Sequence, residues 1–303
     1  LDVSEVEAFL SALATRRQVS ASTQNQALAA LLFLYRHVLG APLPRLEEVT
    51  RAKRPVRLPT VLTPAEVDAV LTALPAAPAS YVLVGLLLYG SGLRLMEALQ
   101  LRVKDVDLER RELTVRGGKG DKDRVTVLAD AAVPLLAMQL RRVAALHRRD
   151  LAGGAGAVVL PGALAQKLPG AVRSLSWQWV FPASSVYRDG GTGEMRRHHL
   201  HETAVQRAVR TAALRAGLRK RVTCHTFRHS FATHLLEAGY DIRTVQELLG
   251  HRDVRTTMIY THVLNRGGRG VVSPADRHPR VAGLRVPQPP GAPPSRPRPR
   301  AAD

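Results

Sequence analysis

Apolar positions recur with a helical period in two segments near the start of the chain. The first follows Ser4 and Glu7, whose spacing is typical of a capping box, and the second covers residues 23–39. Two helices with one apolar face each need partners to cover those faces, so residues 1–45 predict a small helical domain. The chain begins with Leu1 and not Met, and we therefore expect this domain to be truncated at its start.

Residues 46–62 interrupt the periodic pattern. They carry proline and basic residues, among them Lys53 and Arg54, and predict a basic interdomain linker suited to running along a phosphate backbone. A solvated loop without a partner is the alternative. Periodic segments resume at residue 63 and predict a larger domain over 63–270, whereas residues 271–303 are rich in proline and arginine and predict a flexible tail.

The larger domain mixes helices with a β-hairpin. Thr63 and Pro64 form an N-cap followed by proline at the first helical position, and Glu66 completes a capping box. The fold class is therefore mainly α with a small β-sheet (α+β), in two domains. We expect helices at 64–74, 80–89, 91–101 and 201–217, and strands at 112–116 and 124–128.

The charge balance indicates a polyanionic partner. The chain has 44 Lys and Arg against 25 Asp and Glu, a formal net charge of +19, and nucleic acid is the commonest reason for such an excess. A GC-rich genome would explain the preference for arginine but not the excess. A single cysteine excludes a disulfide framework and a multi-cysteine zinc site, and it fits a reducing cytoplasm. The longest apolar run, residues 81–89, is too short to span a bilayer, and we expect no membrane partner.

Candidate chemistry is concentrated in residues 223–262. His225 and Arg228 are three apart on a predicted helix and share a face, His251 follows a helix that ends at Gly250, and Tyr260 comes nine residues later. A guanidinium neutralises a phosphate, imidazoles move protons and a phenol attacks, so this set can break a phosphodiester without a metal. For His229 and His234, on the same helix, we favour structural or surface roles.

Two upstream positions extend the set. Arg94 falls in the first turn of the expected helix 91–101, where a cation opposes the helix dipole. An unfavourable residue at such a position is a reason to infer function, and Glu97, one turn later, can orient its guanidinium. The glycines around Lys119 allow close approach of the backbone to a ligand, although a GGKG turn lacks the full pattern of a phosphate-binding P-loop.

These residues resemble the tyrosine recombinases, and within them the integron integrases. The family order is Arg, Lys, His-x-x-Arg, His and Tyr. The resemblance covers roughly residues 3–275 and implies a helical core-binding (SAM-like) domain plus a mixed catalytic domain, clamped around DNA as a C shape. The family motif falls on Arg94, Lys119, His225, Arg228, His251 and Tyr260.

The narrower resemblance depends on an insert at about residues 155–200, which is similar to the extra helix and following segment of integron integrases. It contains both tryptophans, Trp177 and Trp179, and the adjacent His198 and His199. Aromatic rings beside cations suit stacking on unpaired bases, so these residues are candidate DNA contacts. The alternative is that both tryptophans anchor the insert to the catalytic core.

The resemblance implies a mechanism. The two arginines hold the scissile phosphate, and Tyr260 attacks to give a 3′-phosphotyrosyl bond and a free 5′-hydroxyl. Lys119 resembles the family's general acid, His225 is the candidate base, and His251 donates a hydrogen bond to the phosphate. The 5′-hydroxyl of a partner strand reverses the reaction, so no metal, ATP or other cofactor is implied.

The same resemblance implies substrates and partners. The substrates are a duplex attachment site and the folded single strand of gene-cassette sites. The working assembly is a tetramer of protomers on DNA, in the bacterial cytoplasm.

Four alternatives stay open at this point. They are a recombinase acting only on duplex DNA, a DNA-binding relative disabled by truncation, a type IB topoisomerase, and a metal hydrolase. The insert argues against the first and the intact motif against the second. The hydrolase would use His198, His199 and His201, but histidines at that spacing cannot all face one side of a helix and no carboxylate cluster accompanies them.

Overall fold

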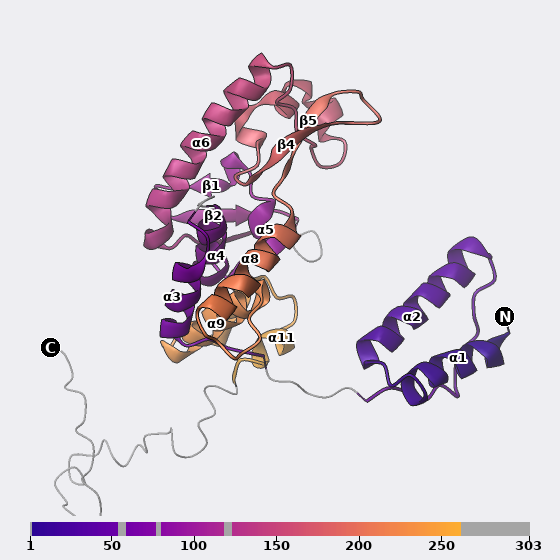
Figure 1. Cartoon of the computed structure of the whole chain (residues 1–303). Coiled ribbons are helices and arrows are strands. Elements are labelled where there is room, and N and C mark those ends of the chain that lie inside the picture. The colour runs from indigo at the N-terminus through magenta and orange to yellow at the C-terminus, as the bar shows by residue number, and fades with distance from the viewer. Residues whose placement is uncertain (1, 54–58, 77–79, 118–122, 262–303) are drawn as a thin grey trace, which may run out of the picture. The chain divides into compact units, whose positions relative to one another are not determined.

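The computed structural model describes residues 2–53, 59–76, 80–117 and 123–261 (Figure 1). The chain divides into two compact units, Leu1–Leu58 and Pro59–Asp303. The described residues are mainly helical with small antiparallel sheets, which confirms the expected α+β class. Among them, no helix combines the length and apolarity needed to cross a membrane.

The first unit contains two helices. Its elements are α1 (Val3–Thr15), α2 (Ala21–Phe33) and a π-helical turn (Leu34–Val38). Val6, Leu10 and Tyr35 form its buried core, and burial of side chains of this size contributes about 1.5–3 kcal/mol each. The capping box of α1 is formed by Asp2 and Glu5 and not by Ser4 and Glu7, because the Glu5 amide donates to Asp2 at 2.8 Å.

The stretch expected to begin the linker packs along this first unit. The buried side chain of Gln24 donates to the Thr50 carbonyl at 2.7 Å and accepts from the Ala52 amide at 2.9 Å. Glu7 likewise accepts a hydrogen bond from the Glu47 amide, at 2.7 Å. Residues beyond 45 therefore belong to the first compact unit.

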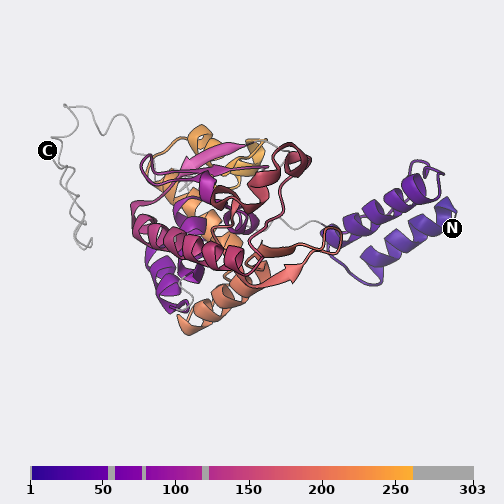
Figure 2. The same cartoon turned by 90° about the horizontal axis from the view of Figure 1, so that it is seen from above.

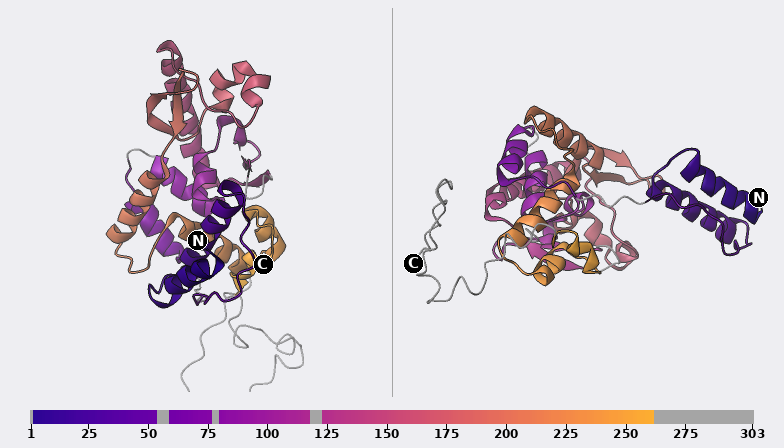
Figure 3. Two further views of the ribbon diagram at one scale, coloured as in Figure 1. Left: turned by 90° about the vertical axis from the view of Figure 1, so that its right-hand side faces the viewer. Right: turned by 90° about the horizontal axis from the view of Figure 1, so that it is seen from below.

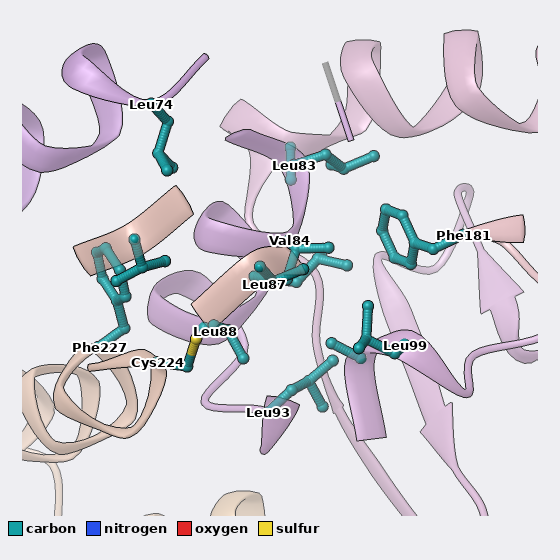
Figure 4. Close-up of a cluster of buried hydrophobic side chains, with 14 of the residues drawn as sticks. Leu74, Leu83, Val84, Leu87, Leu88, Leu93, Leu99, Phe181, Cys224 and Phe227 are labelled. Carbon is teal, nitrogen blue, oxygen red and sulfur yellow. The ribbon is translucent and has the colours of Figure 1, made fainter. Parts of the chain in front are cut away.

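The second unit is organised around α4 (Ser80–Gly90), which packs against other helices on several sides. Leu83, Val84, Leu87 and Leu88 of α4 are buried, and Phe227 and Phe181 pack into the same cluster (Figure 4). The other helices of the unit are α3 (Pro64–Ala73), α5 (Leu95–Leu99), α6 (Val133–Ala152), α7 (Leu164–Lys167), α8 (Glu202–Arg215), α9 (Cys224–Glu237), α10 (Ile242–Leu249) and α11 (Arg255–Met258).

Two small antiparallel sheets complete the unit. The first has the order β1 (Val106–Asp107), β2 (Glu112–Val115) and β3 (Arg124–Val127), and the second pairs β4 (Pro182–Arg188) with β5 (Met195–His199). Val115 pairs with Arg124, so the β2–β3 turn contains the segment 118–122. The Gly117 amide donates to Asp123 at 3.0 Å and closes the base of that turn.

The two ends of the second unit carry different elements. The β4–β5 hairpin lies at one end, and α9 and α11 lie at the other (Figures 1 and 3). The long helix α6 is seen from another side in Figure 2. The insert expected at about 155–200 contains the hairpin β4–β5, the four-residue α-helix α7 and two 3₁₀ helices, Pro169–Arg173 and Leu175–Trp177.

The expected helix 91–101 is much shorter in the structure. It is α5, which begins at Leu95 and has Arg94 as its N-cap. The Arg94 amide donates to Glu97 at 2.8 Å, so the start of the helix is capped by a carboxylate. The dipole penalty inferred for Arg94 therefore does not apply, because Glu97 supplies a negative charge in the same turn.

Candidate active site

Helix α9 provides the centre of the site. Thr223 caps its first turn by accepting from the Thr226 amide, and this sets the register of His225 and Arg228. Arg228 is only 1% exposed and donates to the carbonyls of Gly92 and Leu249, both at 2.6 Å. Gly92 precedes α9 in the sequence and Leu249 follows it, so two separate segments hold the guanidinium.

The Arg228 guanidinium stays cationic despite its burial. Burial lowers the pKa of Arg228 to about 9, and nearby Arg94 adds to the effect while Glu97 opposes it. A group with that pKa is charged at neutral pH. Arg228 is thus a desolvated cation inside the second unit.

Glu97 connects three guanidinium groups. It accepts from Arg94 NH1 at 2.6 Å and from Arg124 NH1 and NH2 at 3.0 and 2.7 Å, and it lies 3.5 Å from Arg228 NH1. Burial alone would raise the pKa of Glu97, but the bonds and charge of Arg124, with Arg94 and Arg228, outweigh it and lower the pKa to about 2. The Glu97 carboxylate therefore holds the two motif arginines, Arg94 and Arg228, close together.

His251 lies against Arg228. Helix α10 ends at Gly250, which adopts the left-handed conformation (φ 63°), and the next residue turns back toward α9. Arg228 NH2 donates to His251 Nε2 at 3.1 Å, so Nδ1 carries the ring hydrogen and donates to Thr257 Oγ1 at 2.9 Å. Burial, followed by the charges of Arg228 and Arg94, lowers the pKa of His251 to about 3, and the ring is neutral.

Tyr260 is buried, with 1% exposure, and packs with Phe231 and Leu249. Its phenol oxygen lies 2.8 Å from Nδ1 of His229. Burial raises the pKa of Tyr260, although the charges of Arg228 and Arg94 act in the opposite direction, so the phenol is protonated at neutral pH.

His225 lies on the exposed surface of α9, one turn before His229. The two rings meet edge to face with centroids 4.5 Å apart. Partial desolvation and then the charges of Arg228 and Arg94 lower the pKa of His225. In the described part of the chain, no hydrogen bond joins His225 to the phenol of Tyr260.

The structure thus brings together five of the six motif residues. Lys119 lies outside the described residues, at the β2–β3 turn whose base is formed by Gly117 and Asp123. Arg54 also lies outside them, and Lys53 is exposed in the first unit. Within the described ranges, no group of three or more His, Cys, Asp or Glu side chains could hold a metal ion.

Two important side chains were not identified from the sequence. Arg124, at the start of β3, binds Glu97 and donates to the Leu248 carbonyl at 3.0 Å. His229, for which the sequence favours a structural or surface role, contacts the phenol of Tyr260. The only sequence signal for His229 is its position directly after Arg228, which does not show where its ring points.

The candidate DNA-contact residues of the insert divide into buried and accessible groups. Trp179 is 7% exposed, donates to the Arg197 carbonyl at 3.2 Å and has the guanidinium of Arg102 above its ring at 3.8 Å. His199 is also buried. Trp179 thus packs between the insert and Arg102, and together with His199 it also lines the cavity that lies beside the insert.

Trp177 and His198 are more accessible and line a cavity of about 790 Å³ between the insert and the first sheet. The Lys104 ammonium lies 3.3 Å from the centre of the Trp177 ring, and Arg116 and Tyr187 line the same cavity. Aromatic rings and cations therefore line one cavity beside the insert.

Comparison with known proteins agrees with this architecture. Two buried or half-buried arginines beside a buried tyrosine, in an α+β unit preceded by a helical unit, are typical of the tyrosine recombinases. The phage integrase family matches residues 60–266, and the N-terminal SAM-like domain of phage integrases matches residues 1–45. The chain belongs to the phage integrase family of tyrosine recombinases.

Individual relatives support this assignment. The chain is 52% identical to an integrase/recombinase of Escherichia coli over 92% of this chain and 82% of the relative. It is 38% identical to the tyrosine recombinase XerA of Thermococcus onnurineus over 72% of this chain and 63% of XerA. It also resembles the crystal structure of XerH bound to a palindromic difH substrate, with a TM-score of 0.59, 25% identity, and coverage of 86% of this chain and 69% of XerH.

Proposed function

We propose that this tyrosine recombinase integrates and excises gene cassettes at integron attachment sites through a 3′-phosphotyrosyl intermediate. Its family supports site-specific recombination, and the charge of +19 and the DNA-bound state of XerH support DNA as partner. The finer assignment, to cassette sites, depends on the insert. We place the reaction in the bacterial cytoplasm, with four protomers on two DNA sites.

The scissile phosphate would bind at Arg94 and Arg228. Arg94 remains partly exposed, with 27% of its side chain accessible, and Arg228 keeps N–H groups beyond those given to Gly92, Leu249 and His251. Both arginines are held by fixed partners, so they can stabilise the charge that develops on a pentacoordinate phosphorus without reorganising.

The other motif residues have proposed roles around that phosphate. Tyr260 attacks phosphorus and Lys119 protonates the 5′ leaving oxygen. His251 donates a hydrogen bond from Nε2 to a phosphate oxygen, which requires its ring hydrogen to move from Nδ1, where it binds Thr257, to Nε2. His225 lies on the exposed side of α9, where DNA would approach. Attack by the 5′-hydroxyl of a partner strand restores the phosphodiester and the free phenol, so the bond energy is conserved without ATP or a metal.

The cavity beside the insert is the observation that carries the cassette-site assignment. It is lined by Trp177, His198 and Tyr187, with Lys104 and Arg116 as cations. Its volume of about 790 Å³ lies within the range of small-molecule sites. A base displaced from a folded single strand would stack on these rings, whereas a regular duplex has no free base to place there.

Covalent trapping on nicked suicide substrates tests this function. A folded bottom-strand cassette hairpin and its linear duplex are each incubated in EDTA with the wild-type protein and with Tyr260→Phe. We expect a protein–DNA adduct on the hairpin that disappears in the phenylalanine variant. An adduct on neither substrate would refute recombinase activity for this chain.

Matched variants test the cavity. His198→Asn removes an accessible ring that lines it, whereas His201→Asn changes an exposed histidine outside it and keeps a capping side chain for α8. We expect His198→Asn to reduce the hairpin adduct and leave the duplex adduct unchanged, and His201→Asn to change neither. The similarity to XerH, whose structure was solved on a palindromic difH substrate, favours a duplex-specific recombinase as the second candidate, and an adduct on duplex alone would support it.

A further inference from the structure

The phenol of Tyr260 has a histidine partner outside the catalytic motif. His229 Nδ1 lies 2.8 Å from the phenol oxygen, and the two rings have centroids 5.5 Å apart. His229 is half-buried on α9, directly after the deeply buried Arg228. One turn of one helix thus positions a cation for the phosphate and an imidazole for the nucleophile.

The ionisation states fit transfer of a proton from oxygen to nitrogen. Burial, then the charges of His225 and Arg228, lowers the pKa of His229 to about 4, so the imidazole is neutral and one ring nitrogen is free to accept. The phenol is protonated because burial raises the pKa of Tyr260. A neutral imidazole with its hydrogen on Nε2 accepts the phenol hydrogen at Nδ1.

We propose that His229 orients the phenol of Tyr260 and accepts its proton at Nδ1 as the bond between the phenol oxygen and phosphorus forms. This role rests on the proposed function. The O–H bond of Tyr260 breaks and an N–H bond at His229 forms, while the 5′-oxygen of the DNA leaves with a proton from another group. On religation the imidazolium returns the proton to the departing phenol.

The bound phosphate makes this transfer feasible. In the free protein, burial and then the charges of His225 and Arg228 oppose formation of an imidazolium at His229, as its low pKa shows. A phosphodiester bound at Arg228 and Arg94 brings a negative charge into the same region and offsets theirs. Proton transfer is thereby coupled to phosphate binding, and the phenol stays protonated when no substrate is present.

The same helix contains a matched control. His234 Nδ1 lies 2.9 Å from the hydroxyl of Tyr89, a histidine–tyrosine pair with nearly the same length but with a tyrosine outside the motif. Replacing His234 by Gln removes an equivalent hydrogen bond from α9. A purely structural role for such pairs predicts similar effects of His229→Gln and His234→Gln on adduct formation.

The test measures single-turnover adduct formation on a suicide substrate. We compare wild type, His229→Ala, His229→Gln and His234→Gln, each with a normal scissile phosphate and with a 5′-bridging phosphorothiolate, whose sulfur leaves without protonation. General acid–base groups contribute roughly 10²–10⁴-fold, so we expect His229→Ala to slow the adduct at least about 100-fold on both substrates. Added imidazole should partly restore it, and His234→Gln should react like wild type.

Three results would overturn the proposal. They are a rate for His229→Ala close to wild type, equal losses in His229→Gln and His234→Gln, and full recovery of His229→Ala on the phosphorothiolate, which would place the residue on the leaving-group side. DNA binding and tryptophan fluorescence identify a variant that has not folded, and His229→Gln then serves in place of His229→Ala. If the wild-type protein forms no adduct on any substrate, the proposed function itself fails, which is a different outcome.

Discussion

Replacing Glu97 by Gln should destabilise the second unit through its three arginines. The carboxylate accepts two hydrogen bonds from Arg124 and two from Arg94, and its side chain is only 10% exposed. Glutamine has nearly the same shape, so the substitution removes the charge without creating a cavity. The guanidiniums of Arg94, Arg124 and Arg228 would then lie close together with no anion to offset their repulsion.

The structure gives the size of this loss. The pKa of Glu97 falls from 4.5 to about 2. At about 1.36 kcal/mol per unit, this shift corresponds to roughly 3 kcal/mol of unfolding free energy at neutral pH. Breaking a buried ion pair by removing one partner typically costs about 3–5 kcal/mol, which agrees with that value. We therefore expect Glu97→Gln to lose roughly 3 kcal/mol at pH 7.

The pH dependence has a definite sign. Because the folded-state pKa of Glu97 is lowered, its stabilising contribution is present above pH 4.5 and is lost as the pH falls toward 2. The difference in unfolding free energy between wild type and Glu97→Gln should therefore be largest at neutral pH. It should shrink steadily below pH 4.5, where the wild-type carboxylate takes up a proton.

Urea unfolding followed by tryptophan fluorescence measures this difference. Both tryptophans, Trp177 and Trp179, belong to the second unit, so the signal reports on the unit that contains Glu97. Asp130→Asn is the control, because Asp130 pairs with Arg111 but is 88% exposed and should lose less than about 1 kcal/mol. A loss below about 1 kcal/mol for Glu97→Gln, or one that does not change between pH 7 and pH 3, would refute the reasoning.

Two further substitutions test other contacts. Gly250→Ala should lower the unfolding free energy by about 1–3 kcal/mol, measured by thermal or urea unfolding, and by more than Gly217→Ala does. Both glycines have positive φ, but only a methyl group at Gly250 would meet Arg124, at 2.7 Å. Equal losses in the two variants would contradict this. Arg102→Lys should lower the unfolding free energy by about 2–3 kcal/mol and change the tryptophan emission. Lysine cannot keep both hydrogen bonds to the carbonyls of Trp177 and Val159 (2.6 and 2.8 Å) together with the contact on Trp179. An unchanged emission spectrum and unfolding midpoint would show that Arg102 does not anchor the insert.

Helix ends and close pairs along the chain could be predicted because their contacts are local. Thr63 and Glu66 form the expected capping box of α3, with hydrogen bonds of 3.2 and 2.8 Å. Arg94 and Glu97, three residues apart, form the expected pair, although the start of their helix was misplaced. The β2–β3 hairpin was also found, since its strands alternate around a glycine-rich turn.

Other elements gave a weaker signal. Helix α6, Val133–Ala152, is amphipathic but was not identified, and the pairing of β4 with β5 was not expected inside the insert. The hydrogen bonds of Gln24 to the backbone of Thr50 and Ala52 also left no signal in the sequence of residues 46–52. Each of these depends on a partner surface that lies elsewhere in the chain.

The sequence by itself determined which reactive groups the protein has and which of them share a helix, because helical geometry relates residues three or four apart. Only the tertiary structure decided that Arg124 holds Glu97 across 27 positions and that His229 holds Tyr260 across 31. Those contacts depend on how α9, α10 and β3 pack, and packing is set by the shapes of many distant side chains together. The order of the motif residues is thus local information, whereas the hydrogen-bond partner of the Tyr260 phenol is a property of the fold.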